Sequence, residues 1–260
     1  MKLVLPILAI LLVACSSDPT APVEQPASVA KALVNSGTVS GYTVELYTDS
    51  VATVGYTPLY LRILRNGSVV RDMHATIMPD MDMGMMHHSC PVEQPDTSAP
   101  DSTGLLRCAA IFTMPSSTTW TIGITLHDHE ADSIAALRLA IPVVDGYGVR
   151  TAASANGVKY VFTLLAAPWK VGMNDVRFAV HSTVDGFSFA PVANAQLFFE
   201  PSMPSMGHGS MGNVQPSHVG NGWYAGRVNF TMTGDWRIDL TVNPLDGALY
   251  TARYDFLVLR

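Results

Sequence analysis

The chain has 260 residues, of which 48% are hydrophobic and 14% are charged, and its formal net charge is −6. This length suits one large domain or two of ordinary size, and the apolar content is ample for a hydrophobic core. With 15 Lys and Arg residues against 21 Asp and Glu residues, the chain lacks the basic groove that nucleic acid requires. We therefore expect no nucleic-acid partner.

The first residues indicate export. Residues 3–14 form an apolar run behind Lys2, about the length of a signal-peptide core and too short to span a bilayer. The run ends Leu-Val-Ala-Cys15, which resembles a bacterial lipobox, in which the cysteine carries the acyl chains and becomes the mature N-terminus. An ordinary signal peptide with an incidental cysteine is the alternative. We expect residues 1–14 to be a lipoprotein signal peptide, and lipidated Cys15 to anchor the protein to a membrane of the bacterial envelope, on its extracytoplasmic side.

The next segments predict a tether and then strands. Residues 15–37 are interpreted as the lipidated N-terminus and a flexible tether, because residues 16–25 are rich in Ser, Pro and Ala. From about Tyr42 onward, short runs of β-branched and aromatic residues alternate with polar ones, which predicts β-strands. The pairs at 66–67 (Asn-Gly) and 185–186 (Asp-Gly) each predict a hairpin turn. Residues 131–139 could form one or two helical turns or another strand.

The two halves of the chain repeat the same order of features. In each half a hairpin signal precedes a Met-Pro-rich segment, and a Phe-Thr-Met sequence then leads through a turn into a strand that opens with Trp120 or Trp236. We predict an all-β chain of two tandem immunoglobulin-like antiparallel β-sandwiches, at residues 38–146 and 156–260. Each Trp is expected to pack between the two sheets of its domain.

The second half resembles the YtkA-like domain family, which is related to the FixH family. The similar segments are residues 203–208 (Met-Pro-Ser-Met-Gly-His), 222–226 (Gly-Trp-Tyr-Ala-Gly) and 230–238 (Phe-Thr-Met-Thr-Gly-Asp-Trp-Arg-Ile). The resemblance implies a small extracytoplasmic immunoglobulin-like sandwich of a kind often encoded near copper-handling or oxidase-assembly genes. The first half departs from this pattern, because it has a long insertion before Phe112 and lacks the Gly-Trp-Tyr-Ala-Gly segment.

Methionine and histidine are concentrated in two short windows, which makes them candidate copper ligands. Thioether sulfur is soft and uncharged and selects Cu(I), whereas imidazole accepts both copper states. Free thiolates oxidise outside the cytoplasm, so methionine is the practicable soft ligand there. The first-choice ligands in the second half are Met203, Met206, His208 and Met211. The pool in the first half is Met81, Met83, Met85, Met86, His87 and His88.

Two other interpretations of these windows remain open. Pro and Gly interrupt both windows, so we expect irregular loops that present no regular buried stripe. Such loops could instead close the end of each sandwich by packing, or offer a methionine-rich surface to a partner protein. Asp80 and Asp82 in the first window would suit a harder ion than Cu(I).

Other candidate residues lie outside these windows. Cys90 and Cys108 are predicted to form a disulfide in an oxidising compartment, with Cys90 as a copper ligand the alternative. In the sequence His-Asp-His-Glu at 127–130, His127 and His129 share a face if the segment is a strand, and could bind a metal or simply end that strand. His74 and His218 are possible extra ligands.

These observations favour a binding protein over an enzyme. The sequence contains no Gly-x-Ser-x-Gly, no phosphate-binding glycine loop and no His-Glu-x-x-His. The expected function is buffering or delivery of Cu(I) in the envelope, with a copper donor or acceptor protein as partner. The alternative is an interaction or spacer module that binds no metal.

Overall fold

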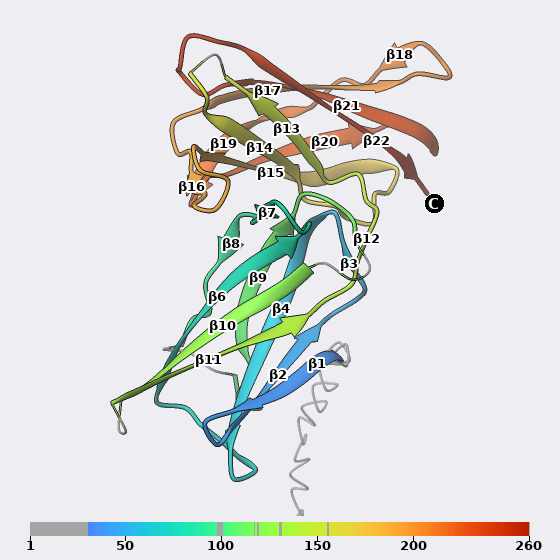
Figure 1. The fold of residues 1–260 in the computed structure, drawn as a ribbon. Coiled ribbons are helices and arrows are strands. Elements are labelled where there is room, and N and C mark those ends of the chain that lie inside the picture. Colours follow the sequence, from blue (N-terminus) through green and yellow to red (C-terminus); the bar gives the residue numbers. More distant parts are fainter. Residues whose placement is uncertain are drawn as a thin grey trace, which may run out of the picture.

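Two β-domains lie end to end along the molecule (Figure 1). The structure, a computed structural model, describes residues 31–97, 101–116, 118, 120–129, 132–154 and 156–259. The expected signal peptide at 1–14, the lipidation site Cys15 and the tether up to residue 30 lie outside the described residues. Among the described residues there is no helix long and apolar enough to cross a membrane.

The first domain is a sandwich of two antiparallel sheets. Its larger sheet has the strand order β1-β2-β4-β9-β8, with β5 paired to β4, and its smaller sheet has the order β11-β10-β6-β7. A short parallel pair joins β12 to β3. The strands are β1 (Ala32–Val39), β2 (Tyr42–Thr48), β3 (Ala52–Thr53), β4 (Gly55–Arg65), β5 (Ser68–Val69), β6 (Met73–Asp82), β7 (His87–His88), β8 (Val92–Glu93), β9 (Leu106–Phe112), β10 (Trp120–Asp128), β11 (Ser133–Ala140) and β12 (Val143–Val144).

The second domain repeats this strand order. One sheet runs β13-β14-β15-β20-β19, with β16 paired to β15, and the other runs β18-β17-β21-β22. Its strands are β13 (Val149–Ala153), β14 (Lys159–Leu164), β15 (Gly172–Thr183), β16 (Ala190–Pro191), β17 (Gln196–Met203), β18 (His208–Gly209), β19 (Val214–Gly220), β20 (Trp223–Phe230), β21 (Gly234–Asn243) and β22 (Tyr250–Val258). The predicted all-β fold of two tandem immunoglobulin-like sandwiches is confirmed.

The predicted domain boundaries were wrong at two places. Strand β1 begins at Ala32 and pairs with β2, so residues 32–37 belong to the first sandwich and not to the tether. Strand β13 begins at Val149 and pairs with β14, so the second sandwich starts before residue 156. Both strands lie at sheet edges, where few apolar residues are needed, and their sequences therefore lack a clear alternating pattern.

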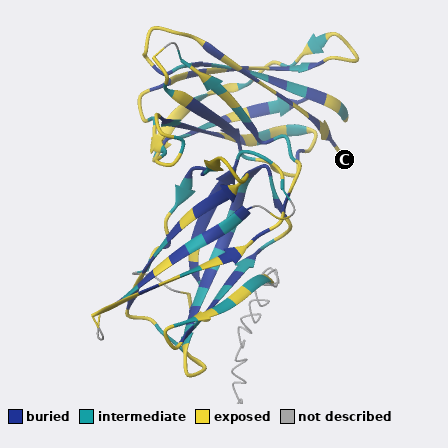
Figure 2. Cartoon of the chain, viewed as in Figure 1, coloured by how far each residue is buried: buried dark blue, intermediate teal, exposed yellow. Residues whose placement is uncertain are grey.

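The two cores are built around equivalent aromatic pairs, and Figure 2 shows buried residues, in dark blue, along the strands of both domains. Trp120 and Trp236 are almost fully buried between the sheets, as predicted. Trp120 packs edge-on against Phe112 with the ring centroids 5.2 Å apart, and Trp236 lies 5.1 Å from Phe230. The Phe-Thr-Met and Trp signals of the sequence therefore mark the same corner of each sandwich.

A glutamine links the two sheets of each domain in the same way. The Ile77 N–H donates to Gln94 Oε1 at 2.8 Å, and Gln94 Nε2 donates to the Ile77 carbonyl at 2.9 Å. Gln215 makes the same two bonds with Phe199 of β17. The amide side chain thus imitates a neighbouring strand and satisfies backbone groups on the opposite sheet.

Some of the predicted local elements are confirmed and others are not. Asn66 and Gly67 both have positive φ, and they join paired residues Arg65 and Ser68 in a two-residue turn. Residues 133–140 form strand β11 and not a helix. Asp185-Gly186 is not a two-residue hairpin, because β15 and β16 first pair at Ser182 and Ala190. The Asp185 carboxylate accepts N–H bonds from the next residues and shapes a longer loop.

The two domains contact each other through the residue after β7, through β8 and through the start of β4. The Ser89 N–H donates to the Gly186 carbonyl at 3.2 Å. The Trp223 indole N–H donates to Glu93 at 2.9 Å, and the Trp223 ring packs edge-on against Tyr56. The first methionine-histidine segment therefore lies at the domain junction.

Candidate metal site

The first methionine-histidine segment is a β-hairpin and not the irregular loop expected. Met81 pairs with His88 and Asp82 pairs with His87 across β6 and β7. Strand β6 tolerates Pro79 because the nitrogen of this residue points away from β10. The missing N–H therefore removes no hydrogen bond between β6 and β10. The Pro79 carbonyl, on the same edge as its nitrogen, accepts the Ser89 hydroxyl at 2.7 Å.

Alternation divides the ligand pool between the two faces of this hairpin. The Met83 N–H donates to the Met86 carbonyl at 2.9 Å, so the register continues and these two residues face each other. Side chains two residues apart share a face of a strand, so Met83 and Met86 lie on the face of Met81 and His88. His87 lies on the opposite face.

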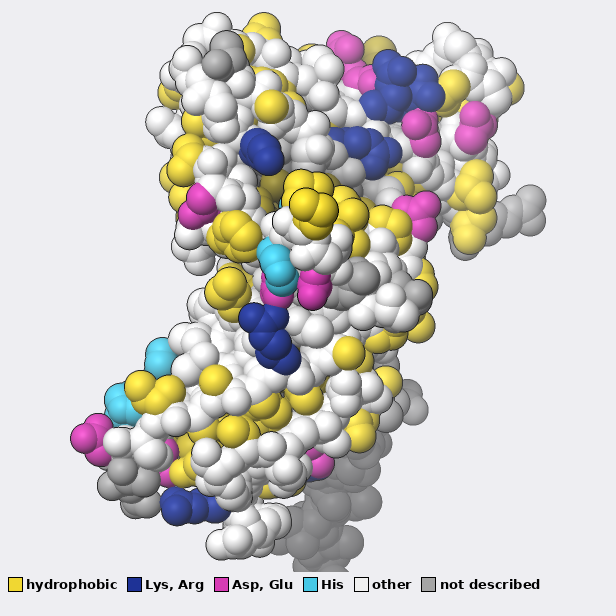
Figure 3. Space-filling model, viewed as in Figure 1, with side chains coloured by type: hydrophobic (Ala, Val, Ile, Leu, Met, Phe, Trp, Pro, Cys, Tyr) yellow, Lys and Arg dark blue, Asp and Glu magenta, His cyan; other side chains and the backbone are white. Residues whose placement is uncertain are grey.

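The thioethers at the hairpin tip are open to solvent. Met83 is 52% exposed, Met86 59% and Met85 99%, whereas Met81 is buried in the core. His88 is half-buried. Figure 3 shows hydrophobic side chains over the β6–β7 hairpin, beside histidine, acidic and basic side chains. Two accessible thioethers and one imidazole therefore share one face, next to a buried third thioether.

The opposite face holds an electrostatic chain that fixes the hairpin. His87 Nδ1 lies 3.1 Å from Asp80 Oδ1, and Arg138 on β11 forms an ion pair with the same carboxylate. Burial alone would raise the Asp80 pKa, but the bonds from Arg138 and His87 outweigh it and lower that pKa. The ionised carboxylate can only accept, so Nδ1 of His87 carries the proton and Nε2 faces Asp82 at 3.9 Å.

The first-choice ligands of the second domain are only partly together. Met203 pairs with His208 across β17 and β18, so these two share a face. Met203 is buried, and its terminal methyl group would lie only 2.4 Å from a Cβ atom added to Gly234. The φ of Gly234, +132°, also favours glycine at this position. His208 packs edge-on against Trp236 with the ring centroids 6.1 Å apart. Met203 is therefore a packing residue first.

The other two candidates of the second domain lie outside this pair. Met206 is exposed in the turn between β17 and β18, where its N–H donates to the Met203 carbonyl at 3.1 Å. Met211 follows β18 and is exposed, and its carbonyl accepts from Asn229 of β20, in the other sheet. The segment is again a hairpin, but it carries fewer thioethers beside its histidine than the first.

Two further methionines, Met114 and Met232, were not among the candidates from the sequence. The Trp120 indole N–H donates to the Met114 carbonyl at 2.9 Å, and Trp236 donates to the Met232 carbonyl at the same distance. Met114 and His88 line one cavity of about 210 Å³ at the domain junction. The signal was present, because both methionines end the repeated Phe-Thr-Met sequence.

The predicted disulfide between Cys90 and Cys108 is wrong for this structure, because both residues are free and buried. Val92 pairs with Ala110, which places Cys108 opposite residue 94, four positions from Cys90. Four residues of strand span about 13 Å, whereas the Cα atoms of a disulfide lie less than about 7 Å apart. Burial raises the pKa of the Cys108 thiol to about 12, and that of Cys90 well above its usual value. Neither is a ready metal ligand.

Free buried thiols give a direct chemical prediction. Without prior reduction, Cys90 and Cys108 should resist alkylation in the folded protein and take one label each after unfolding in urea. Peptide mass mapping scores the two sites separately from Cys15. Labelling that appears only after a reductant is added would show that the disulfide exists.

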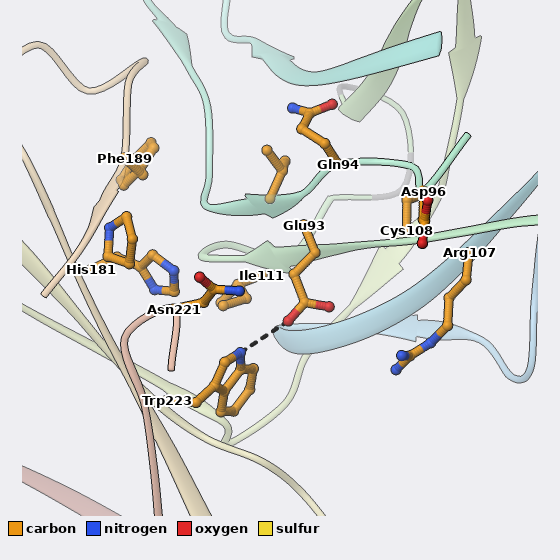
Figure 4. A pocket seen from close by; sticks show the side chains of 12 residues that line it. Glu93, Gln94, Asp96, Arg107, Cys108, Ile111, His181, Phe189, Asn221 and Trp223 are labelled. Carbon is orange, nitrogen blue, oxygen red and sulfur yellow. Dashed lines mark hydrogen bonds between the residues drawn. The ribbon is translucent and has the colours of Figure 1, made fainter. Parts of the chain in front are cut away.

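The domain junction also encloses a cavity of about 620 Å³. Figure 4 shows His181 and Asn221 on one side, with Glu93 bonded to Trp223. His181 is 7% exposed and its Nδ1 has no hydrogen-bond partner in the structure. Burial lowers the His181 pKa to about 4, and the nearby Glu93 offsets this only in part. The ring is therefore neutral at pH 7.

Acid should destabilise the protein through His181. The unfolded chain binds a proton at this ring below about pH 6.5, and the folded chain does so only near pH 4. The contribution of His181 to the free energy of unfolding is therefore fully present above pH 6.5. As the pH drops to 4, this contribution falls by about 3 kcal/mol. Urea unfolding at a series of pH values should show this loss, and His181→Gln should flatten it. If His181→Gln loses as much stability at low pH as the wild type, other titratable groups cause the loss.

The described residues hold no group of three or more His, Cys, Asp and Glu side chains arranged for a metal ion. The candidate site is therefore the methionine-rich face of the β6–β7 hairpin, with a sparser equivalent at β17–β18.

One family model matches part of the chain. Residues 152–241 match the family described as YtkA-like, which confirms the resemblance of the second half. The protein is thus a two-domain chain of immunoglobulin-like sandwiches, and most of its second domain matches the YtkA-like family model. A search of the curated proteins found no match.

Several solved structures are similar at low identity. Domains 5–6 of the S-layer protein SbsC are 13% identical, with 89% of this chain and 100% of that chain covered and a TM-score of 0.33. A conserved domain protein from Bacillus anthracis is 9% identical over 88% and 90% of the two chains, with a TM-score of 0.33. A chimeric titin Z1Z2 is 10% identical over 88% and 99%, with a TM-score of 0.23. These likenesses carry no argument about function.

Proposed function

We propose that this protein is a lipid-anchored, extracytoplasmic Cu(I)-binding protein that buffers or delivers copper in the bacterial envelope. The observation that carries the proposal is the shared face of Met83, Met86 and His88 on the β6–β7 hairpin, with Met81 beneath them. Two exposed thioethers and an imidazole can provide a trigonal Cu(I) shell. Met85, the most exposed of these methionines, lies in the turn and could first meet the arriving ion.

The proposed shell suits an ion that must be passed on. Thioethers are neutral ligands, so the bound ion keeps its positive charge and can exchange with a partner's ligands. The hairpin itself is held by the bonds of His87 to Asp80 and of Asp80 to Arg138, which limits the ordering that binding must impose. Because Cys90 and Cys108 are buried with raised pKa values, neither of these two thiols competes as a thiolate with the thioethers at neutral pH.

The anchor and the compartment come from the sequence. Leu-Val-Ala-Cys15 at the end of an apolar run supports lipidation of Cys15, and the lipid would tether the two domains near a membrane. A copper donor or acceptor protein of the envelope is the partner that such a carrier requires.

Packing remains the second interpretation for the second domain alone. Met203 fills the space beside Gly234, and His208 lies against Trp236, so both have structural partners. We therefore assign the main site to the first domain and expect the β17–β18 hairpin to bind copper more weakly.

An anaerobic titration tests the proposal. The purified protein competes with a chromophoric Cu(I) chelator, and we expect one tightly held ion per chain. Prior oxidation of the methionines to sulfoxides should abolish the competition, because the soft sulfur is lost. Failure of the reduced, folded protein to compete would remove the copper function and leave the partner-contact interpretation of the exposed methionines.

A further inference from the structure

Three histidines, His74, His127 and His129, lie close together where β6 begins and β10 ends, at the end of domain 1 that points away from domain 2 (Figure 1). His74 of β6 is paired directly opposite His127 of β10. His129 follows two residues later, and its ring centroid lies 4.7 Å from that of His127.

Strand alternation places His74 and His127 on the solvent face, and His129 is exposed in the turn that follows β10. Leu126 and Asp128 are buried, so His127 between them points outward. Met73 and Ala75 are buried on either side of His74 in the same way. Directly opposite residues of an antiparallel pair have Cβ atoms about 5 Å apart, within reach of one ion.

We propose that His74, His127 and His129 bind a borderline divalent cation such as Zn²⁺ or Cu²⁺. Imidazole nitrogens bind these ions at about 2.0–2.1 Å, so two rings of a tetrahedral shell place their nitrogens about 3.3 Å apart. The His127 and His129 ring centroids lie 4.7 Å apart, which is close enough for both rings to approach one ion. Asp132 Oδ1 lies 3.9 Å from His127 Nε2 and can complete the shell, or water can do so.

One rearrangement is required. The three rings do not yet converge on one point in the described residues. His74 is exposed, and its ring makes a long, 3.5 Å approach to the Thr97 hydroxyl, so a change of side-chain rotamer brings it to the shell at little cost. The ion would link β6 to β10 at the open end of the sandwich.

This site is chemically and spatially separate from the thioether site. It offers nitrogen and oxygen donors and no sulfur, and it lies at the opposite end of β6 from the β6–β7 hairpin. It would therefore take the borderline divalent ions that thioethers bind poorly.

Zinc competition tests this proposal. The full protein is titrated with Zn²⁺ against a fluorescent zinc chelator, beside His127→Gln, His74→Gln and the control His218→Gln, an exposed histidine on β19. We expect wild type and His218→Gln to bind one Zn²⁺ at this site. His127→Gln should lose it, and His74→Gln should bind at least about tenfold more weakly.

Three results would overturn the site. They are failure of the wild type to compete, unchanged affinity in His127→Gln, and unchanged affinity in His74→Gln, which would remove the third ligand. The variant His88→Gln distinguishes this site from the β6–β7 hairpin at the other end of the domain. If His88→Gln lost Zn²⁺ binding and His127→Gln retained it, the ion would be bound by the hairpin. Cu(I) binding is measured independently, so either site can fail without the other.

Discussion

Replacing Met83 and Met86 with Leu and His88 with Gln should weaken Cu(I) binding by at least about two orders of magnitude. Each substitution removes one ligand of the proposed shell, and a lost interaction worth about 1.4 kcal/mol costs tenfold in affinity. Leucine keeps the volume and apolarity of methionine, so the hairpin and its packing should survive. Anaerobic competition against a chromophoric chelator gives the ratio of dissociation constants.

Matched controls separate ligand loss from general disturbance. Met173→Leu changes a partly exposed methionine on β15, and Met206→Leu changes the sparser hairpin. We expect Met173→Leu to leave the Cu(I) affinity unchanged. Met206→Leu should alter only the weaker Cu(I) binding by the β17–β18 hairpin. The assignment to the first hairpin would be wrong if Met206→Leu lost the tight ion and the triple variant kept it.

Trp236→Ala should destabilise domain 2 by about 3–5 kcal/mol, which is the usual cost of emptying a fully buried aromatic site. The indole is almost completely buried, packs 5.1 Å from Phe230 and supports the ring of His208. Its removal also leaves the Met232 carbonyl without the indole donor, which adds to the loss.

Equilibrium urea unfolding measures this effect through the fluorescence of Trp169, which is buried in the same core of domain 2 and is present in each of these variants. Trp236→Phe keeps part of the packing and should cost less than Trp236→Ala. Trp223→Phe, at the domain junction, is the matched control for loss of an indole hydrogen bond at a partly buried site. A loss below about 1 kcal/mol in Trp236→Ala would contradict a role for this residue as the centre of the core.

The sequence predicted the parts of the fold that depend on local chemistry. The Asn66-Gly67 turn follows from the need for positive φ, and the buried tryptophans follow from their place in the repeated segments. Alternation also accounts for the outward direction of His127 on β10, whereas His129 lies in the turn after that strand. Each of these is decided by residues close together in the chain.

The remaining features depend on register, which a single sequence does not reveal. Pro79 lies within a strand because its nitrogen faces away from β10, and this edge is known only once the pairing is known. The pairing of β8 with β9 separates Cys90 from Cys108, and the pairing of β6 with β7 places Met83 opposite Met86 but His87 on the other face. The link from Trp223 to Glu93 joins residues of different domains, beyond the reach of any local pattern.

X-ray absorption at the copper edge tests the central claim most directly. The protein is loaded anaerobically with one equivalent of Cu(I), and the triple variant is the control. We expect a three-coordinate ion with two sulfur neighbours from Met83 and Met86 and one nitrogen neighbour from His88. A shell of nitrogen and oxygen alone, or the same sulfur shell in the triple variant, would contradict binding of Cu(I) by this hairpin.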